Sequence, residues 1–193
     1  MLRKLKETEL DKYMDFAYTL ALDQSKSSYP TYTDGIKTKE DFTQSAKDAF
    51  SREDEEILLF EEDGEVHGWI HYYVLKEDDY LKIQVFNVES GVERAIDEFI
   101  SYVTEKYAGC TVYFGLPKAN QNAISHLQKS GFTKDEESLV GVMHFEAYQL
   151  KTGAEGIVTV TRENYGEFAS LHVVEELGFE DIGTYVLYIR LLG

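Results

Sequence analysis

The chain has 193 residues, 43% of them hydrophobic and 13% aromatic, and its formal net charge is −17. This composition predicts a folded globular protein, and the acidic balance argues against partners that need a cationic surface, such as nucleic acid or an anionic membrane. No run approaches the roughly 18 apolar residues of a membrane span, and the single cysteine, Cys110, excludes an internal disulfide framework. We therefore expect a soluble cytoplasmic protein that binds neither nucleic acid nor membrane.

Two amphipathic helices are predicted near the N-terminus. Residues 7–22 place their apolar side chains on one helical stripe, with acidic residues in the first turns, where the helix dipole favours them. A polar loop rich in serine and tyrosine follows. Thr38 then begins a second helix, with Asp41 three residues further on as in a capping box, and this helix runs to about Phe50.

A three-stranded antiparallel meander is predicted for residues 56–88. The dipeptide Asp63-Gly64, between two strand-like runs, is a strong hairpin signal. Strict alternation along the middle strand would place Val66 on the same face as Ile70.

The elements after the meander predict the fold class. Its third strand, residues 81–88, leads into an amphipathic helix that ends at Gly109. A strand at residues 110–117, a helix at 119–131 and two strand-like runs at 132–150 follow. Because a strand–helix–strand step makes a parallel crossover, we predict an α/β protein with a mixed, mostly antiparallel sheet flanked by helices.

The chain is predicted to divide near residue 150. Residues 1–150 would form the α/β domain, and residues 151–193 a β-α-β extension after a small linker. The layout of the extension echoes the start of the chain, so it is either the start of a second, incomplete unit or a completion of the first sheet. Its last apolar run, residues 184–193, is expected to pack on that sheet or to form an interface, as in a homodimer.

The segment after the strand at 110–117 resembles part of a known family. It has the pattern Asn120-x-x-Ala123-Ile124-x-x-x-x-Lys129-x-Gly131-Phe132. In this pattern, and in the order of elements over about residues 2–150, the chain resembles the GNAT superfamily of N-acetyltransferases. The resemblance implies a GNAT-like twisted sheet, acetyl-CoA as the cofactor, and acetyl transfer to a small amine.

The resemblance also implies where acetyl-CoA would lie. The sheet would open between the strand at 81–88 and the strand at 110–117, and main-chain amides near Phe86 and Val88 would hold the pantetheine arm. Asn120 would border this arm, because an acidic residue there would repel a polyanionic cofactor. This interpretation accounts for a helix start that carries no acidic residue.

The phosphate-binding turn of the family is degenerate in this chain. Members present backbone N–H groups of a glycine-rich turn and a helix N-terminus to the pyrophosphate. The matching candidates for cofactor binding are Gly91, Val92, Arg94 and Ala95. Glu89 and Glu93 flank the turn and would oppose a pyrophosphate unless Arg94 compensates. A plain acid-capped helix is the alternative interpretation.

The usual proton donor of the family is also missing. Many members carry a tyrosine four positions after the alanine, and the matching residue here is Leu127, which has no proton to give. His126 on the same helix and Glu89 just past the third strand are the catalytic candidates. His71 is a further candidate base. It shares a strand face with His67, but a pair without a third ligand does not predict a metal site.

Two main functional hypotheses follow. The first is an acyl-CoA-dependent N-acetyltransferase, in which catalysis rests on proximity and orientation and does not require a strong acid. The alternative is a degenerate, non-catalytic GNAT-like domain that acts as a scaffold, regulatory or partner-binding module. A third hypothesis is an α/β binding module unrelated to the family.

Overall fold

The computed structural model describes residues 1–28, 37–142, 160–162 and 180–193. The described helices are α1 (Leu10–Ala21), α2 (Lys39–Ala49), α3 (Val92–Lys106) and α4 (Gln121–Lys129), with short 3-10 helices η1 (Glu7–Glu9) and η3 (Lys76–Asp78). The described strands are β1 (Leu2–Lys4), β2 (Glu55–Glu62), β3 (Glu65–Leu75), β4 (Tyr80–Val88), β5 (Thr111–Pro117), β6 (Thr133–Val142), β7 (Val160–Arg162) and β8 (Glu180–Leu191). None of the helices in these ranges has the length and apolar character needed to cross a membrane.

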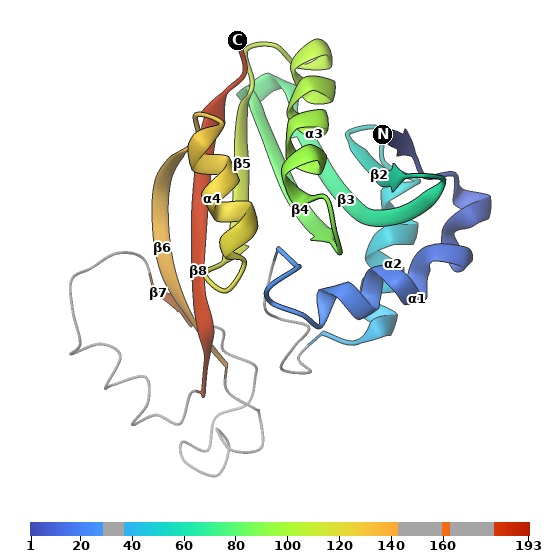
Figure 1. Ribbon diagram of the computed structural model, residues 1–193, viewed down its shortest axis with the longest axis horizontal. Coiled ribbons are helices and arrows are strands. Elements are labelled where there is room, and N and C mark those ends of the chain that lie inside the picture. Colours follow the sequence, from blue (N-terminus) through green and yellow to red (C-terminus); the bar gives the residue numbers. More distant parts are fainter. Residues whose placement is uncertain (29–36, 143–159, 163–179) are drawn as a thin grey trace.

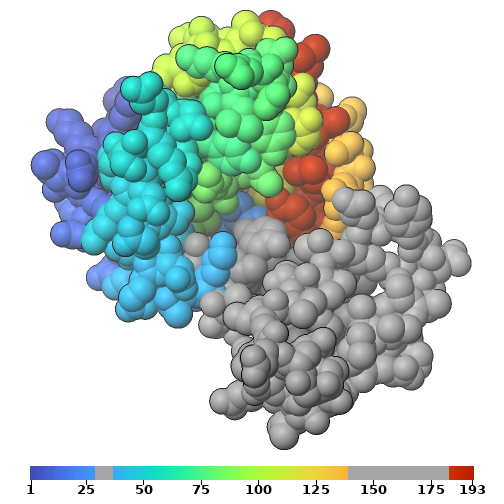
Figure 2. Space-filling model, turned by 180° about the vertical axis from the view of Figure 1, so that it is seen from behind, coloured from blue at the N-terminus to red at the C-terminus, as the bar shows by residue number. Residues whose placement is uncertain are grey.

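The strands form one mixed sheet in the order β1-β2-β3-β4-β5-β8-β6-β7 (Figure 1). The described neighbours pair antiparallel, except that β4 and β5 run parallel and are joined by the α3 crossover. Seen from behind, the N-terminal helices (blue) lie at one side of the molecule, and β8 (red) lies beside β6 (orange) at the other (Figure 2). The predicted fold class is confirmed.

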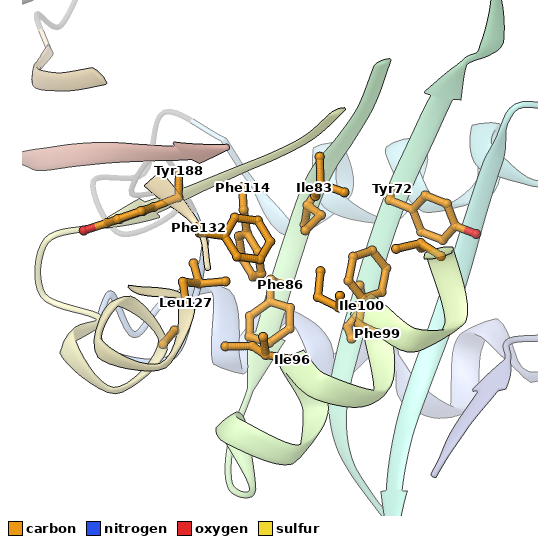
Figure 3. Packing of buried hydrophobic residues seen from close by; sticks show 14 of the residues in the cluster. Tyr72, Ile83, Phe86, Ile96, Phe99, Ile100, Phe114, Leu127, Phe132 and Tyr188 are labelled. Carbon is orange, nitrogen blue, oxygen red and sulfur yellow. The ribbon is translucent and has the colours of Figure 1, made fainter. Parts of the chain in front are cut away.

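An apolar cluster covers each face of the sheet. The larger cluster lies under α3 and α4, and Figure 3 shows part of it, including Phe86, Ile96, Phe99, Phe114 and Leu127. The smaller cluster joins α1 and α2 to β2 and β3 around Trp69. Because the buried apolar side chains of β4 and β5 belong to the larger cluster, close packing in that cluster fixes the courses of the two strands.

The hairpin between β2 and β3 forms where the sequence predicts it. Asp63 and Gly64 have φ angles of 51° and 85°, the pair of positive values that a type I′ turn requires. Beyond the turn, the pairing of β2 with β3 skips His67, which is therefore the extra residue of a bulge. The bulge reverses the alternation, so Val66 packs with the cluster around Trp69 and not beside Ile70 as predicted.

A second bulge lies in β4, where the pairing with β3 skips Gln84. β4 pairs with β5 only from Tyr80 to Lys82, so the two strands part at almost the same level. A bulge bends its strand and increases the local twist, and this one directs the rest of β4 away from β5. Beyond this level Ile83–Val88 of β4 and Phe114–Pro117 of β5 are not paired with each other, and we call the region where these two segments diverge the wedge (Figure 1).

β8 lies between β5 and β6 and pairs antiparallel with both. The apolar run predicted at residues 184–193 therefore contributes a strand inside the sheet, in agreement with the alternative in which the tail completes the first sheet. The boundary near residue 150, most of the second strand-like run predicted before it and the helix predicted after residue 162 lie outside the described residues. The division into two units and the homodimer stay predictions.

Glu56 is the centre of a polar network at the start of β2. Its carboxylate accepts hydrogen bonds from the hydroxyls of Tyr72 (2.7 Å) and Tyr102 (2.8 Å), and it pairs with Lys4 and Lys106. Burial by itself would raise the pKa of this carboxyl, but the donors outweigh burial and lower the pKa to about 2. One carboxylate thus joins β1, β2, β3 and α3.

We predict that Glu56→Gln lowers the free energy of unfolding by about 1–3 kcal/mol at neutral pH, because it removes the negative charge with which the tyrosine hydroxyls and the lysines interact. Since the folded pKa lies below the ordinary 4.5, the wild-type advantage is complete above that pH and is lost as the pH falls toward about 2. Urea unfolding of both proteins across this range measures the difference. A difference that stays constant below pH 4.5 would contradict the prediction. The control is Glu53→Gln at an exposed position, with an expected effect below about 0.5 kcal/mol.

Candidate functional site

Two main-chain N–H groups of β4 face the wedge. The Phe86 N–H donates to Ser28 Oγ at 2.9 Å, and the Val88 N–H donates to the Lys26 carbonyl oxygen at 3.0 Å. The next N–H along, that of Glu89, points the other way and donates to β3. The resemblance to the family implies that amides near Phe86 and Val88 hold the cofactor arm. The structure directs both into the wedge, where groups of the same chain accept their hydrogen bonds.

The segment Lys26–Ser28, which follows α1, lies along this edge of β4 (Figure 1). Ser27 and Ser28 are only 1% and 4% exposed, so these two residues of the segment lie in the interior. Asn87 of β4 holds α1 in place, because the Asn87 Nδ2 donates to the Ala17 carbonyl oxygen at 3.1 Å. The end of α1 is thereby held next to the wedge.

Asn120, at the start of α4, contacts the segment Lys26–Ser28 on the side away from β4. Its Nδ2 donates to the Ser27 carbonyl oxygen at 3.0 Å, and its Oδ1 accepts the Ala123 N–H at 3.4 Å as the N-cap of α4. The side chain is 1% exposed. An aspartate could cap the helix but could not donate to Ser27. The structure therefore supplies a reason for the missing acid that is independent of any cofactor.

The turn before α3 has one residue in a left-handed conformation. Gly91, the N-cap of α3, has φ of 68°, and a Cβ placed there would lie 2.8 Å from Glu62 Oε2. Arg94, which the sequence offers as the compensating cation, pairs with Glu62 at 3.0 Å and with Glu98 at 3.3 Å. Ala95 is buried in the larger core cluster. The Arg94 charge is therefore already matched by carboxylates of the chain.

A hollow of about 710 Å³ lies over the first turns of α3 and along α4. It is lined by Glu89, Ser90, Gly91, Val92, Glu93, Arg94, Asp97, Asn122, Ser125 and Lys129. The lining holds three carboxylates and two cations, so its formal charge is negative. A pyrophosphate in this hollow would meet repulsion from the carboxylates as well as attraction from the helix N-termini.

The two predicted catalytic residues lie in different surroundings. Glu89 is half-exposed in the lining of the hollow, with its carboxylate 3.9 Å from His67 Nδ1. His126 faces α3, where its Nε2 is 2.7 Å from Asp97 and its Nδ1 is 3.8 Å from Glu93. Leu127, at the position of the family tyrosine, is buried in the core (Figure 3). The ring of His126 is therefore held between α3 and α4 by acidic side chains, whereas Glu89 lies in the hollow beside the turn before α3.

His71 is buried on the middle strand, away from these residues. Its Nε2 lies 2.8 Å from Glu55 Oε2, and Arg52 pairs with the same carboxylate at 2.5 Å. The hydrogen bond from His71 is the largest influence on Glu55 and lowers the pKa of its carboxyl. Within the described part of the chain, no group of three His, Cys, Asp or Glu side chains is placed to hold a metal ion.

Two features of the wedge are not predicted from the sequence. The first is the segment Lys26–Ser28, whose polar residues indicate only a surface loop. The second is Tyr185 of β8, whose ring lies over Gly115 of β5, where a Cβ would overlap the hydroxyl. A glycine inside a strand signals a close approach of this kind, but it does not name the partner.

The described residues fit acetyl-CoA in part. The wedge has main-chain donors for an extended arm, but they are engaged by Lys26–Ser28. The turn before α3 has the glycine and the helix N-terminus that a phosphate site uses, but it also has carboxylates close by. An arm could lie in the wedge only after the segment moved.

The parted parallel strands, the bulge in β4 and the crossover helix define a class of split-sheet α/β proteins, and comparison with solved structures identifies the fold within it. No protein-family model and no curated protein matches the chain. The chain has the fold of the GNAT superfamily of N-acetyltransferases, which confirms the predicted resemblance at the level of the fold.

Three solved structures illustrate the similarity. Spermidine N-acetyltransferase from Vibrio cholerae, in complex with CoA and spermine, is 9% identical with a TM-score of 0.61, over 100% of this chain and 95% of that one. The GNAT-family acetyltransferase from Streptococcus pneumoniae is 13% identical with a TM-score of 0.60, over 100% and 99%. An N-acetyltransferase from Staphylococcus aureus Mu50 is 15% identical with a TM-score of 0.58, over 100% and 98%. At such low sequence identity, the similarity shows a common fold and does not show a common activity.

We predict that Asn120→Asp lowers the free energy of unfolding by about 1–3 kcal/mol, because a buried carboxylate would replace the donor to the Ser27 carbonyl. Chemical denaturation in the absence of any ligand measures this. Asn122→Asp, exposed in the first turn of the same helix, is the matched control and should be neutral or slightly stabilising. Equal stability of the two variants would show that the donor at position 120 is not needed.

Proposed function

We propose that this chain is an N-acetyltransferase that transfers an acetyl group from acetyl-CoA to a small amine. The observation that carries the proposal is the wedge, where β4 leaves β5 and turns the N–H groups of Phe86 and Val88 toward the space between them. Donors on a free strand edge bind an extended ligand that offers amide carbonyls, as the pantetheine arm does. The GNAT fold of the chain is consistent with this assignment.

The proposed roles of the residues follow from their places. The thioester supplies an activated acetyl group, and the amine nitrogen displaces sulfur from its carbonyl carbon as the carbon–sulfur bond breaks. Phe86 and Val88 orient the arm through their N–H groups, and Gly91, Val92 and Arg94 border the phosphates. Glu89, half-exposed in the hollow, accepts the proton that the ammonium loses. Leu127 gives no proton to the sulfur, so water carries the second proton of the nitrogen to the departing thiolate, and proximity accounts for most of the acceleration.

The charge of the chain supports an amine as the acceptor. A net charge of −17 and an acidic hollow attract cations and repel acidic acceptors. The Vibrio cholerae enzyme with this fold is a spermidine N-acetyltransferase, seen with spermine. Together they favour a cationic amine over a carboxylate-bearing acceptor.

A second candidate is a non-catalytic GNAT-fold domain that serves as a scaffold or regulatory module. It is favoured by one specific observation: the donors of the wedge and the cation of the turn are already bound by groups of the chain. In this alternative the wedge is a permanent part of the interior, and acetyl-CoA does not bind.

We predict that acetyl-CoA at about 100 times its dissociation constant raises the melting temperature by roughly 5–10 °C, since such saturation stabilises the folded state by about 2.7 kcal/mol. A thermal-shift titration with acetyl-CoA and with CoA, followed by an assay for acetylated amine, measures binding and transfer separately. No shift at millimolar ligand would refute the acetyltransferase and leave the non-catalytic domain. A shift without transfer would refute catalysis alone.

We further predict that Glu93→Gln tightens acetyl-CoA binding about two- to fivefold at low ionic strength, because it removes a carboxylate from the lining of the hollow. Pantetheine, which lacks the phosphates, should bind equally to the variant and the wild type. Glu105→Gln, exposed at the far end of α3, is the control for loss of one charge and should have little effect. A Glu93 effect as large for pantetheine as for acetyl-CoA would show that the phosphates do not lie there.

A further inference from the structure

The wedge is closed by the chain's own segment through contacts on both of its sides. On one side, β4 donates to Lys26 and Ser28, and Ser28 Oγ in turn lies 3.4 Å from the Gln84 carbonyl oxygen. On the other side, Asn120 at the start of α4 donates to the carbonyl oxygen of Ser27. Lys26–Ser28 therefore bridges the space where β4 and β5 have parted, and its groups satisfy the free edge of β4.

The bonding groups of this segment are those that an extended arm would offer. The acceptors for Val88 and Phe86 are a carbonyl oxygen and a hydroxyl on one short stretch of chain. A ligand with amide carbonyls would make the same kind of bonds to the same two donors. The segment and such a ligand cannot use these donors at the same time.

The closed arrangement contains one unsatisfied group. Ser27 is 1% exposed, and its Oγ has no hydrogen-bond partner among the residues that the structure describes. A buried hydroxyl without a partner destabilises the state that buries it. Ser28, its neighbour, has the opposite effect because its Oγ accepts a buried N–H. Ser28 therefore stabilises the position of the segment against β4, and Ser27 destabilises it.

We propose that Lys26–Ser28 is an intramolecular strap that closes the wedge, and that a ligand enters only when the strap leaves the edge of β4. The proposal rests on the proposed function for the identity of the ligand. Closure by the strap does not depend on it. Because ligand binds the open state alone, its apparent dissociation constant is the intrinsic value divided by the open fraction. The strap therefore sets the affinity of the wedge without contributing to the chemistry.

Amide hydrogen exchange followed by NMR tests the closure without any ligand. The Val88 N–H is the informative reporter, because its acceptor is the Lys26 carbonyl and neither serine side chain touches that bond. Ser28→Ala should raise the exchange rate at Val88 about five- to tenfold, and Ser27→Ala should lower it about three- to tenfold. Ser25→Ala, whose hydroxyl bonds to Asp23 outside the wedge, is the control and should leave the rate unchanged.

Calorimetric titrations of the same proteins with acetyl-CoA and with pantetheine test the gating. Ser28→Ala should bind both ligands about five- to tenfold more tightly than the wild type, and Ser27→Ala should bind both more weakly by a similar factor. Pantetheine separates the wedge from the phosphate turn. Opposite changes in the two serine variants are the signature of a strap, because a merely structural role would weaken binding in both.

The outcomes separate the two proposals. Unchanged Val88 exchange in both serine variants overturns the strap, whatever the ligands do. Shifted exchange with unchanged affinities shows that ligand does not enter through the wedge and overturns the gating. Shifted exchange with no binding of either ligand to any of the proteins overturns the proposed function and still supports closure by Lys26–Ser28.

Discussion

A main-chain donor that is buried must find an acceptor, and this constraint governs the centre of the molecule. The bulge at Gln84 turns β4 away from β5 and leaves donors on its edge without a neighbouring strand. The Phe86 N–H lies in a buried hydrogen bond, so water does not serve as its partner. In this structure the acceptors come from the loop after α1, and in the proposed function a ligand replaces them. The loop after α1 fills that edge, and the buried cap of α4 holds the loop in place.

The starts of α3 and α4, which border the wedge, differ in the number of acidic side chains close to them. The start of α3 gathers carboxylates, with Glu89 and Glu93 in the hollow and Glu62 over Gly91. The start of α4 has no acidic residue in its first turn, and its cap, Asn120, must donate as well as accept. An anion therefore meets a favourable helix dipole at both starts, but side-chain repulsion mainly at the first. This asymmetry makes the start of α3 the less favourable of the two helix starts for a phosphate.

Local signals in the sequence predict the helices and strands, but not the bulges of the sheet or the point where β4 and β5 stop pairing. The Asp63-Gly64 hairpin and the apolar stripe of α3 depend on neighbouring residues, and both form as predicted. The position of Val66 depends on a bulge at His67, which no alternation rule reveals. The strap depends on the partners of Lys26–Ser28, which lie about 60 and 90 residues away along the chain. The resemblance to the GNAT superfamily implies donors near Phe86 and Val88, but their acceptors follow from the fold alone.

The place of β8 between β5 and β6 has a consequence for biosynthesis. β5 is complete by residue 117, yet its antiparallel partner is a strand that begins at residue 180. Until that strand leaves the ribosome, β5 and β6 each expose a free strand edge, and edges of this kind invite pairing with other chains. A nascent chain of this design is therefore most exposed to wrong strand pairing before residues 180–191 have been made.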